Sequence, residues 1–533
     1  MKDALRTALS VLLLATPAIA AESGSNLGAI DFPNSGAAEA QDAFLRGVAA
    51  LHSFWYEEAA EAFQNAQEID PAFALAYWGE AMTYNHPLWS EQDIASARSV
   101  LRRLGDTRTE RIDKTPTERE RMYLEAVEEL YGEGDKLDRD RAYEKAMARL
   151  HEKFPEDTEA AAFHALSLLG LVRPGEHGFF RQMKAGAIVL DIFQKHPDHP
   201  GAAHYVIHSF DDPEHAPLAL PAANRYAEIA PEAHHALHMP SHIFVQHGMW
   251  DRVAQSNLES YNASAKWAES KGLSIEKRDY HSLQWRAYAN LQRGVWDEVL
   301  DSVKIVEDAA KQTQSTRLER IRSSMEATYL IETGRFGSVA LPEGDDDTSR
   351  YSSTANMILA AGMGAAQAND ADRAAEAATR MAKLRAEAEG RADDYAAKNY
   401  AIMEHELSGL AAMARGETDA ALSHLAKAAS IEEEQDPPSG PAYPIKPSHE
   451  LYGELLAKAG RHEDAVREFQ TSLQRMPNRT ASLLGLARSS KQLKDQDTAT
   501  RCYEMLETFL RDADPDVPFL EEVRGFQAAT EDR

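Results

Sequence analysis

Cysteine is almost absent from this chain of 533 residues, since Cys502 is the only one. A single cysteine excludes a framework of intrachain disulfides and any metal site built from several thiolates. Basic residues are scarce too: 57 lysines and arginines stand against 86 aspartates and glutamates, and the formal net charge is −29. Nucleic acids and anionic membrane surfaces attract basic proteins, so we expect neither as a partner. Beyond residue 21, no apolar run approaches the length of a membrane span.

The first 21 residues have the pattern of a secretory signal peptide. Lys2 and Arg6 form its positive end, an apolar stretch follows over residues 8–15, and residues 18–20 (Ala-Ile-Ala) match a small-x-small cleavage site. A short buried N-terminal helix is the alternative. We therefore expect an exported protein, either periplasmic or secreted.

A repeat of about 34 residues runs along the chain. Small residues allow two helices to cross closely, an aromatic residue fills the gap to the next unit, and proline ends the second helix. Spacings of 12, 4 and 8 occur near the start and again near the end, in Gly47, Ala59, Phe63 and Pro71 and in Gly453, Ala465, Phe469 and Pro477. Glycines that predict turns inside units are Gly248, Gly294, Gly334 and Gly460.

This pattern resembles the tetratricopeptide repeat family. The resemblance implies an all-α fold, a superhelical solenoid of helix–turn–helix units with a concave groove. It also implies that the first helix of each unit lines the groove, through unit positions 2, 5, 9, 12 and 13. We find no alternation of polar and apolar residues that predicts a strand.

The repeats divide the chain into segments. The proline-rich linker is either a passive spacer or a segment that folds back over the groove, and the sequence leaves both open. Residues 169–182 are an insertion within one unit. The predicted segments are the signal peptide (1–21), an extended leader (22–39), a solenoid (40–430) with histidine-rich central repeats (200–250), the proline-rich linker (431–448), and a C-terminal pair of repeats with a tail (449–533).

Histidine is the most informative residue type. Ten of the 20 histidines lie within residues 196–247. In the phased repeats, His204 and His208 take positions 5 and 9 of one unit, and His238 and His242 take the same positions of the next. Residues four apart lie on the same face of a helix, so each pair presents two imidazoles together.

These pairs predict a metal site. Imidazoles from packed helices, whose axes lie about 8–10 Å apart, can meet at one ion. Neutral imidazole suits zinc, copper, nickel or iron, and Asp211, Asp212 or Glu214 could add a carboxylate. Histidines in a groove can instead hydrogen-bond a peptide or cap helices, and spacing does not decide between these roles. The predicted ligands are His204, His208, His238, His242 and Asp212, with zinc or copper as the candidate ion.

Other polar and aromatic residues fall near groove positions and suit an extended peptide or a sugar-like ligand. Packing between repeats is the alternative for the tryptophan among them. We find no nucleophile elbow, phosphate-binding glycine loop or Cys/His pair, so no catalytic residue is predicted. The candidate ligand-binding residues are Trp78, Asn85, His86, His235, His281 and Gln284.

Residues 202–213, with 238–244 and 85–89, also resemble a large group of exported bacterial tetratricopeptide proteins that has no settled activity. The primary interpretation is an exported scaffold whose groove binds a protein or peptide partner. The alternative is a zinc-, copper- or iron-binding protein, and it extends to a metal-dependent hydrolase. The oligomeric state is not predicted.

Overall fold

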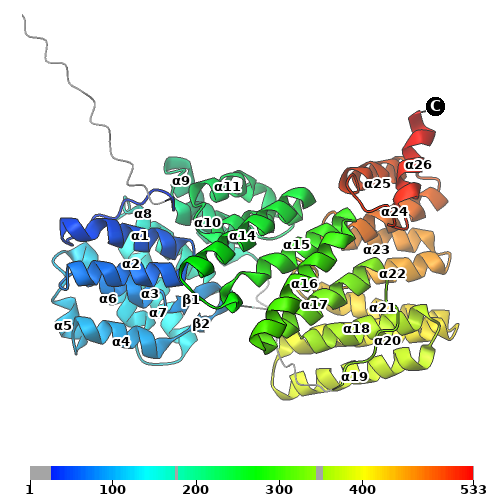
Figure 1. The fold of residues 1–533 in the computed structure, drawn as a ribbon, viewed down its shortest axis with the longest axis horizontal. Helices are drawn as coiled ribbons and strands as arrows, with labels where there is room; N and C mark the ends of the chain where they lie inside the picture. The colour runs from blue at the N-terminus through cyan, green and yellow to red at the C-terminus, as the bar shows by residue number, and fades with distance from the viewer. Residues whose placement is uncertain (1–25, 174–177, 344–351, 532–533) are drawn as a thin grey trace, which may run out of the picture.

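The computed structural model describes residues 26–173, 178–343 and 352–531. The predicted signal peptide lies outside these residues. The predicted all-α fold class is confirmed, because helices follow one another along the described part of the chain (Figure 1). The strands among the described residues are β1 (Asn85–His86) and β2 (Glu91–Gln92), which pair antiparallel.

Most helices pack mainly against their neighbours in the sequence, as expected for a solenoid. Aspartate side chains such as those of Asp157 and Asp279 begin several helices by accepting a backbone N–H. The helices of the first half are α1 (Gln41–His52), α2 (Tyr56–Ile69), α3 (Ala74–Met82), α4 (Ile94–Leu104), α5 (Arg108–Ile112), α6 (Glu118–Leu130), α7 (Lys136–Lys153), α8 (Thr158–Leu169), α9 (Phe180–Lys195), α10 (Pro200–Ser209), α11 (Ala216–Ile229), α12 (His234–His238), α13 (Pro240–Gln246) and α14 (Trp250–Ser270).

The second half continues the series, and Figure 1 shows it beside the first half. Its helices are α15 (Tyr280–Arg293), α16 (Trp296–Thr313), α17 (Thr316–Thr333), α18 (Ser353–Gln367), α19 (Ala371–Gly390), α20 (Asp394–Ala414), α21 (Thr418–Glu433), α22 (Ser448–Lys458), α23 (His462–Arg475), α24 (Thr480–Gln492), α25 (Gln496–Phe509) and α26 (Leu520–Glu531). Short 3₁₀ helices are η1 (Ala38–Ala40), η2 (Pro87–Trp89) and η3 (Ile275–Lys277).

The repeated glycines and phenylalanines have a shared packing role. A Cβ atom on Gly453 would lie 2.9 Å from the Phe469 ring, and one on Gly485 would lie 2.2 Å from it. Near the start of the chain, Gly47 and Gly79 approach the ring of Phe63 in the same way. Helices can therefore cross close to each ring only where the crossing residue lacks a side chain.

Three of the four predicted turn glycines lie between the two helices of a hairpin. Gly248, Gly294 and Gly460 have φ values of 64°, 72° and 79°, in the left-handed region that favours glycine. The fourth prediction, a hairpin that turns at Gly334, is wrong, because no second helix follows the turn directly. Gly334 ends α17, but residues 335–343 are not helical.

The first half curls until its ends meet. Helix α1 packs against α10 as well as against α2 and α3. The side chains of Trp267 and Lys271, at the end of α14, contact Glu58 on α2 at 3.3 and 3.4 Å. Because of this closure, the inner surface of these repeats is largely filled by side chains instead of forming an open groove.

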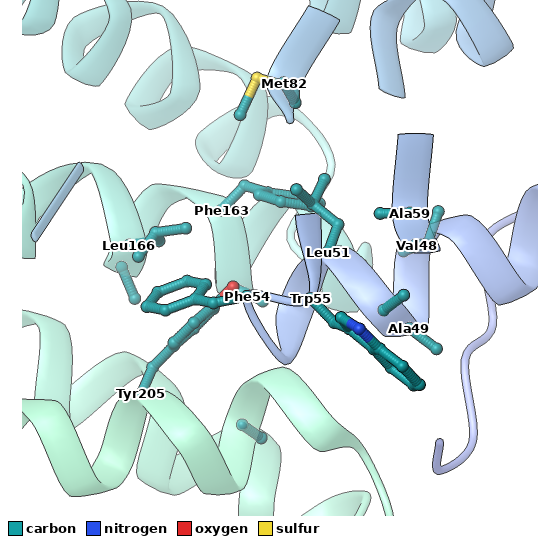
Figure 2. Close-up of a cluster of buried hydrophobic side chains, with 14 of the residues drawn as sticks. Val48, Ala49, Leu51, Phe54, Trp55, Ala59, Met82, Phe163, Leu166 and Tyr205 are labelled. Carbon is teal, nitrogen blue, oxygen red and sulfur yellow. The ribbon is translucent and has the colours of Figure 1, made fainter. Parts of the chain in front are cut away.

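The turn that follows α1 points into this interior. Figure 2 shows the Phe54 side chain directed toward Leu166 and Tyr205, whereas Trp55 extends to the other side of the turn. Phe54 has a φ of 53°, an uncommon backbone conformation for a bulky residue. This turn places an aromatic ring at the centre of the first half.

The leader and the proline-rich linker both pack on the repeats. In the leader, the backbone N–H of Ala29 donates to the Asp198 carbonyl at 2.9 Å, and Phe32 is buried. The non-helical part of the linker, residues 434–447, crosses Trp285: a Cβ atom on Gly440 would lie 2.4 Å from the indole ring. Among the described residues, we find no helix long and apolar enough to span a membrane.

Candidate metal centre

Five histidines meet inside the first half and are called the histidine cluster here. Helix α10 carries two of them, and α12 and α13 carry the other three. Pro240 splits the predicted second helix into α12 and α13 because it lacks an N–H to continue the hydrogen-bond ladder. The members of the cluster are His204, His208, His235, His238 and His242.

The two predicted i, i+4 pairs are in contact. The Nε2 atoms of His204 and His208 lie 3.1 Å apart, and those of His238 and His242 also lie 3.1 Å apart. His235 joins the first pair, since its ring centroid lies 5.0 Å from that of His204. The two pairs approach each other at His208 and His242, whose ring centroids are 6.1 Å apart.

Three imidazoles are held by hydrogen bonds from their other nitrogen. The Nδ1 atom of His204 lies 2.6 Å from the backbone carbonyl oxygen of His52, and the Nδ1 atom of His242 lies 2.6 Å from Asp211 Oδ2. The Nδ1 atom of His238 lies 2.6 Å from Asn257 Oδ1. These oxygens accept, so in each ring Nδ1 carries the proton and Nε2 keeps its lone pair.

The orientation of the Asn257 amide supports this assignment. Its Nδ2 group donates to the Val253 carbonyl at 2.8 Å, so Oδ1 is the atom that faces His238. His238 therefore donates through Nδ1 and presents Nε2 to His242.

Burial favours the uncharged form of four members of the cluster, His204, His208, His235 and His238. It lowers the pKa of His204 to about 3, with a further contribution from neighbouring imidazoles. Burial and the adjacent histidines also hold the pKa values of His208, His235 and His238 well below the ordinary range. Neutral imidazoles with free lone pairs are the form that binds metal ions.

The histidines that lie close enough to share one metal ion are not the four that the sequence predicted. Candidate ligand atoms of His204, His208 and His235 all lie within 4.8 Å of one another. The four predicted histidines do not together meet that limit within the described part of the chain. Sequence reasoning gave His235 a place in the ligand groove, whereas the structure puts it beside the first pair.

Asp212 takes a different place from the one predicted. Its Oδ1 accepts from the backbone N–H groups of Glu214 and His215 at 2.9 and 3.0 Å, and also contacts His215 Nδ1 at 2.9 Å. Asp212 therefore stabilises the turn before α11, and Asp211 is the carboxylate that reaches the cluster.

Aromatic rings enclose the cluster. Phe54 lies edge-on to His204 with ring centroids 4.3 Å apart, and Trp285 covers His242 at the same centroid distance. The proline-rich linker packs on the other part of Trp285 through Gly440. Trp89, 51% exposed, lies 6.3 Å from His235 and marks the side that faces solvent.

The remaining predicted groove residues are spread over several surroundings. Trp78 is fully buried among Phe32, Tyr123 and Phe163, so it is a core residue instead of a groove residue. The packing alternative accounts for it.

Four of these residues lie nearer the cluster or at its edge. Asn85 accepts from Gln92 across the two short strands at 3.1 Å, and His86 stacks on Tyr56 at 4.0 Å. On α15, exposed His281 lies 4.9 Å from the ring of His238, and Gln284 is half-buried.

A second group supports the cluster from behind. Glu159 accepts from His52 Nε2 at 2.6 Å and from His199 Nε2 at 3.0 Å, and all three side chains are buried. The two histidines hold the pKa of Glu159 well below its usual range, against the effect of burial. The other nitrogen of His52 accepts from Tyr205 at 2.9 Å.

This second group is fully hydrogen-bonded and orients His52, whose carbonyl positions His204. The sequence contained no signal that joins Glu159 to His52. The two residues are 107 positions apart and meet only because the repeats close on themselves.

Comparisons with known proteins add no functional assignment. No protein-family model and no curated protein matches the sequence. Among solved structures, the human IFIT1 dimer with m7Gppp-AAAA is 13% identical, with 90% of this chain and 91% of that chain covered and a TM-score of 0.32. Yeast Tom70 is 12% identical, with coverages of 92% and 96% and a TM-score of 0.29. The Cut9–Hcn1 hetero-tetramer of APC/C gives 12% identity, the same coverages and a TM-score of 0.27. These scores are too low to support inferences about this chain.

Proposed function

We propose that this chain is an exported helical-repeat scaffold that binds a divalent transition-metal ion through its histidine cluster. One observation supports the proposal above all. His204, His238 and His242 each donate Nδ1–H to a fixed oxygen and keep the Nε2 lone pair for the cluster. Histidines that ligate metals almost always donate their other N–H to a carboxylate or carbonyl in this way.

The donor set favours zinc or copper. The cluster offers imidazole nitrogens, whereas magnesium and calcium prefer oxygen ligands. Three histidines leave one coordination position for water, as in hydrolytic zinc sites. A metal-dependent hydrolytic activity is therefore the chemistry to assay once the metal is established.

The test is the metal content of the purified mature chain after exposure to Zn²⁺ and extensive dialysis. We expect bound zinc in the wild type and a loss of zinc in His208→Ala, which changes a half-buried ligand. His424→Ala, which changes a half-buried histidine on α21, is the matched control and should keep the wild-type content. Zinc-free wild-type protein, or equal zinc in both variants, would overturn the proposal.

A second proposal concerns a peptide partner. The chain's own proline-rich linker lies against Trp285 beside the cluster, and Gln246 Nε2 approaches the Pro438 carbonyl at 3.4 Å. This surface therefore accommodates extended proline-rich chain, and exposed Trp89 lies on the opposite side of the cluster. The net charge of −29 disfavours a nucleic acid there.

A synthetic peptide with the sequence of residues 434–447 is the probe for this second proposal. We expect saturable binding, followed by fluorescence anisotropy of a dye on the peptide, and weaker binding to Trp285→Ala, which removes the ring that the linker covers. An anisotropy that does not change on adding the protein would rule the proposal out.

A further inference from the structure

The histidine cluster contains two separate sets of ligand atoms. The first is His204, His208 and His235, whose ligand atoms lie within 4.8 Å of one another. The second is the pair His238 and His242, with Nε2 atoms 3.1 Å apart. The described residues contain no group of three or more candidate ligands within 4.8 Å that combines the two sets.

In the second pair, the hydrogen bonds of the two rings direct one Nε2 atom toward the other. His238 donates Nδ1–H to Asn257 Oδ1, and His242 donates Nδ1–H to Asp211 Oδ2. In neutral rings both Nε2 atoms are then acceptors, so two lone pairs face each other at 3.1 Å. Two facing lone pairs repel each other, and either a metal ion beside the two nitrogens or an additional proton between them relieves that repulsion.

Another histidine pair in the chain shows the contrast. The Nδ1 atoms of His405 and His424 lie 3.2 Å apart, on the long neighbouring helices α20 and α21. No hydrogen bond to a protein acceptor fixes the proton on the other nitrogen of either ring in the described structure, so one ring can donate to the other. His238 and His242 lack that freedom, because Asn257 and Asp211 already take their protons.

The spacing of the second pair suits an ion. Two nitrogens bound at about 2.0–2.1 Å to a tetrahedral zinc ion lie about 3.3 Å apart. Trp285 holds both rings in place, with centroid distances of 5.1 Å to His238 and 4.3 Å to His242. His281, 4.9 Å from His238, is the nearest further imidazole outside the cluster on this side.

We infer that the cluster holds two transition-metal ions: one on His204, His208 and His235, and a second on His238 and His242. This inference rests on the proposed metal-binding function and extends it from one ion to two. The second ion completes its coordination with solvent, or with His281. Asp211 and Asn257 act as positioning residues, since each fixes the proton of a ligand without touching the ion.

The number of zinc ions per chain tests the inference. The full mature chain is loaded with Zn²⁺, dialysed against buffer with a weak chelator, and measured for metal and protein. We expect two ions in the wild type, one in the double variant His238→Ala/His242→Ala and one in His208→Ala/His235→Ala. The control is His405→Ala/His424→Ala, which removes a close histidine pair outside the cluster and should keep two.

The possible outcomes are distinct. One ion in the wild type, lost from both cluster variants, would mean a single site shared by all five histidines and would overturn the two-ion inference. One ion in the wild type that is retained by His238→Ala/His242→Ala would overturn it too. In that case a proton on His242, beside Asp211, links the two rings of the second pair in place of a metal ion. A wild type without zinc would overturn the proposed function itself. The wild-type count does not depend on whether any variant folds.

Discussion

The acceptors behind the histidine cluster determine which nitrogen of each ring is available. His52, Asp211 and Asn257 contribute a backbone carbonyl, a carboxylate and an amide oxygen from three parts of the chain. Of these three residues, the sequence suggested only Asp211 as part of a metal site. It suggested Asp211 as a metal ligand, whereas in the structure Asp211 accepts a hydrogen bond from His242. The role of all three is to keep three Nε2 lone pairs pointing into the cluster.

Removing one acceptor should weaken metal binding without removing a ligand. In Asp211→Ala, the Nδ1–H of His242 loses its partner and the ring can adopt the other tautomer or turn away. We expect zinc affinity at the second ion to fall about 10–100-fold, the usual effect of losing such a partner. Competition with a fluorescent zinc chelator measures it.

Asp211→Asn distinguishes positioning from a structural role. The amide oxygen can still accept from His242, so we expect most of the affinity to return. Equal losses in the alanine and asparagine variants would contradict the positioning role.

The stability of the protein in acid should depend on buried neutral histidines away from the cluster as well. Burial, with help from His151 and Lys184, lowers the pKa of His164 to about 4. In the unfolded chain the same group titrates near 6.5, so the unfolded state binds the proton first as pH falls. Its contribution to stability is therefore present above about pH 6.5 and decreases between pH 6.5 and 4.

His164→Gln removes this titration. From pH 7 to pH 4 we expect the variant to lose less stability than the wild type, by an amount of the order of 2 kcal/mol. Thermal unfolding followed by circular dichroism at several pH values measures it. Parallel pH profiles of the two proteins would contradict this, because they would mean that His164 has the same pKa in the folded and unfolded states.

At the scale of elements, close helix crossings explain which residues recur in the repeats. Phe469 packs on Gly453 within its own hairpin and on Gly485 of the next one, with no space for a side chain at either glycine. This is why the spacing of glycine, alanine and phenylalanine was sufficient to predict the hairpins. The spacing did not predict that residues 335–343 after Gly334 are not helical. A turn glycine alone does not show whether the segment after it forms a helix.

Gly485→Ala is expected to destabilise the C-terminal repeats. Its Cβ would lie 2.2 Å from the Phe469 ring, which must move in a packed core, and such overpacking costs about 1–3 kcal/mol. Chemical unfolding monitored by circular dichroism tests it. Gly525→Ala, in α26 with open space around the Cβ, is the control and should be neutral or slightly stabilising.

For the molecule as a whole, the contacts that matter most join residues far apart in sequence. The histidine pairs were visible from the 34-residue period, but their burial was not. Closure of the first half brings Phe54, Glu159 and Trp285 around them, and a period describes only neighbouring repeats. For the same reason, Trp78 and Asp212 were assigned to surfaces that the folded chain uses for packing and capping.

A buried ionic group joins distant repeats of the second half. The Arg479 guanidinium at the start of α24 donates to Glu450 at 2.9 Å, to Tyr288 at 3.1 Å and to Glu332 at 3.2 Å. These partners come from α22, α15 and α17, and Arg479 is 1% exposed. The group thus closes the second half much as α1, α10 and α14 close the first.

Arg479→Met should therefore destabilise the protein strongly, because Glu332 loses its cation and buried Glu450 keeps only Lys446, at 3.0 Å. We expect a loss of about 3–5 kcal/mol, seen as a lower midpoint of chemical unfolding. Arg488→Met, which breaks a half-exposed pair with Glu522, should change stability by less than about 1 kcal/mol. Similar effects of the two variants would contradict the closing role of Arg479.

The central claim is that imidazoles of the histidine cluster bind a metal ion, and X-ray absorption at the zinc edge of the zinc-loaded full chain tests it most directly. The account predicts a first shell of nitrogen or oxygen atoms at about 2.0–2.1 Å, with the outer-shell scattering of several imidazole rings and no sulfur. A first shell of oxygen atoms without imidazole scattering would contradict it.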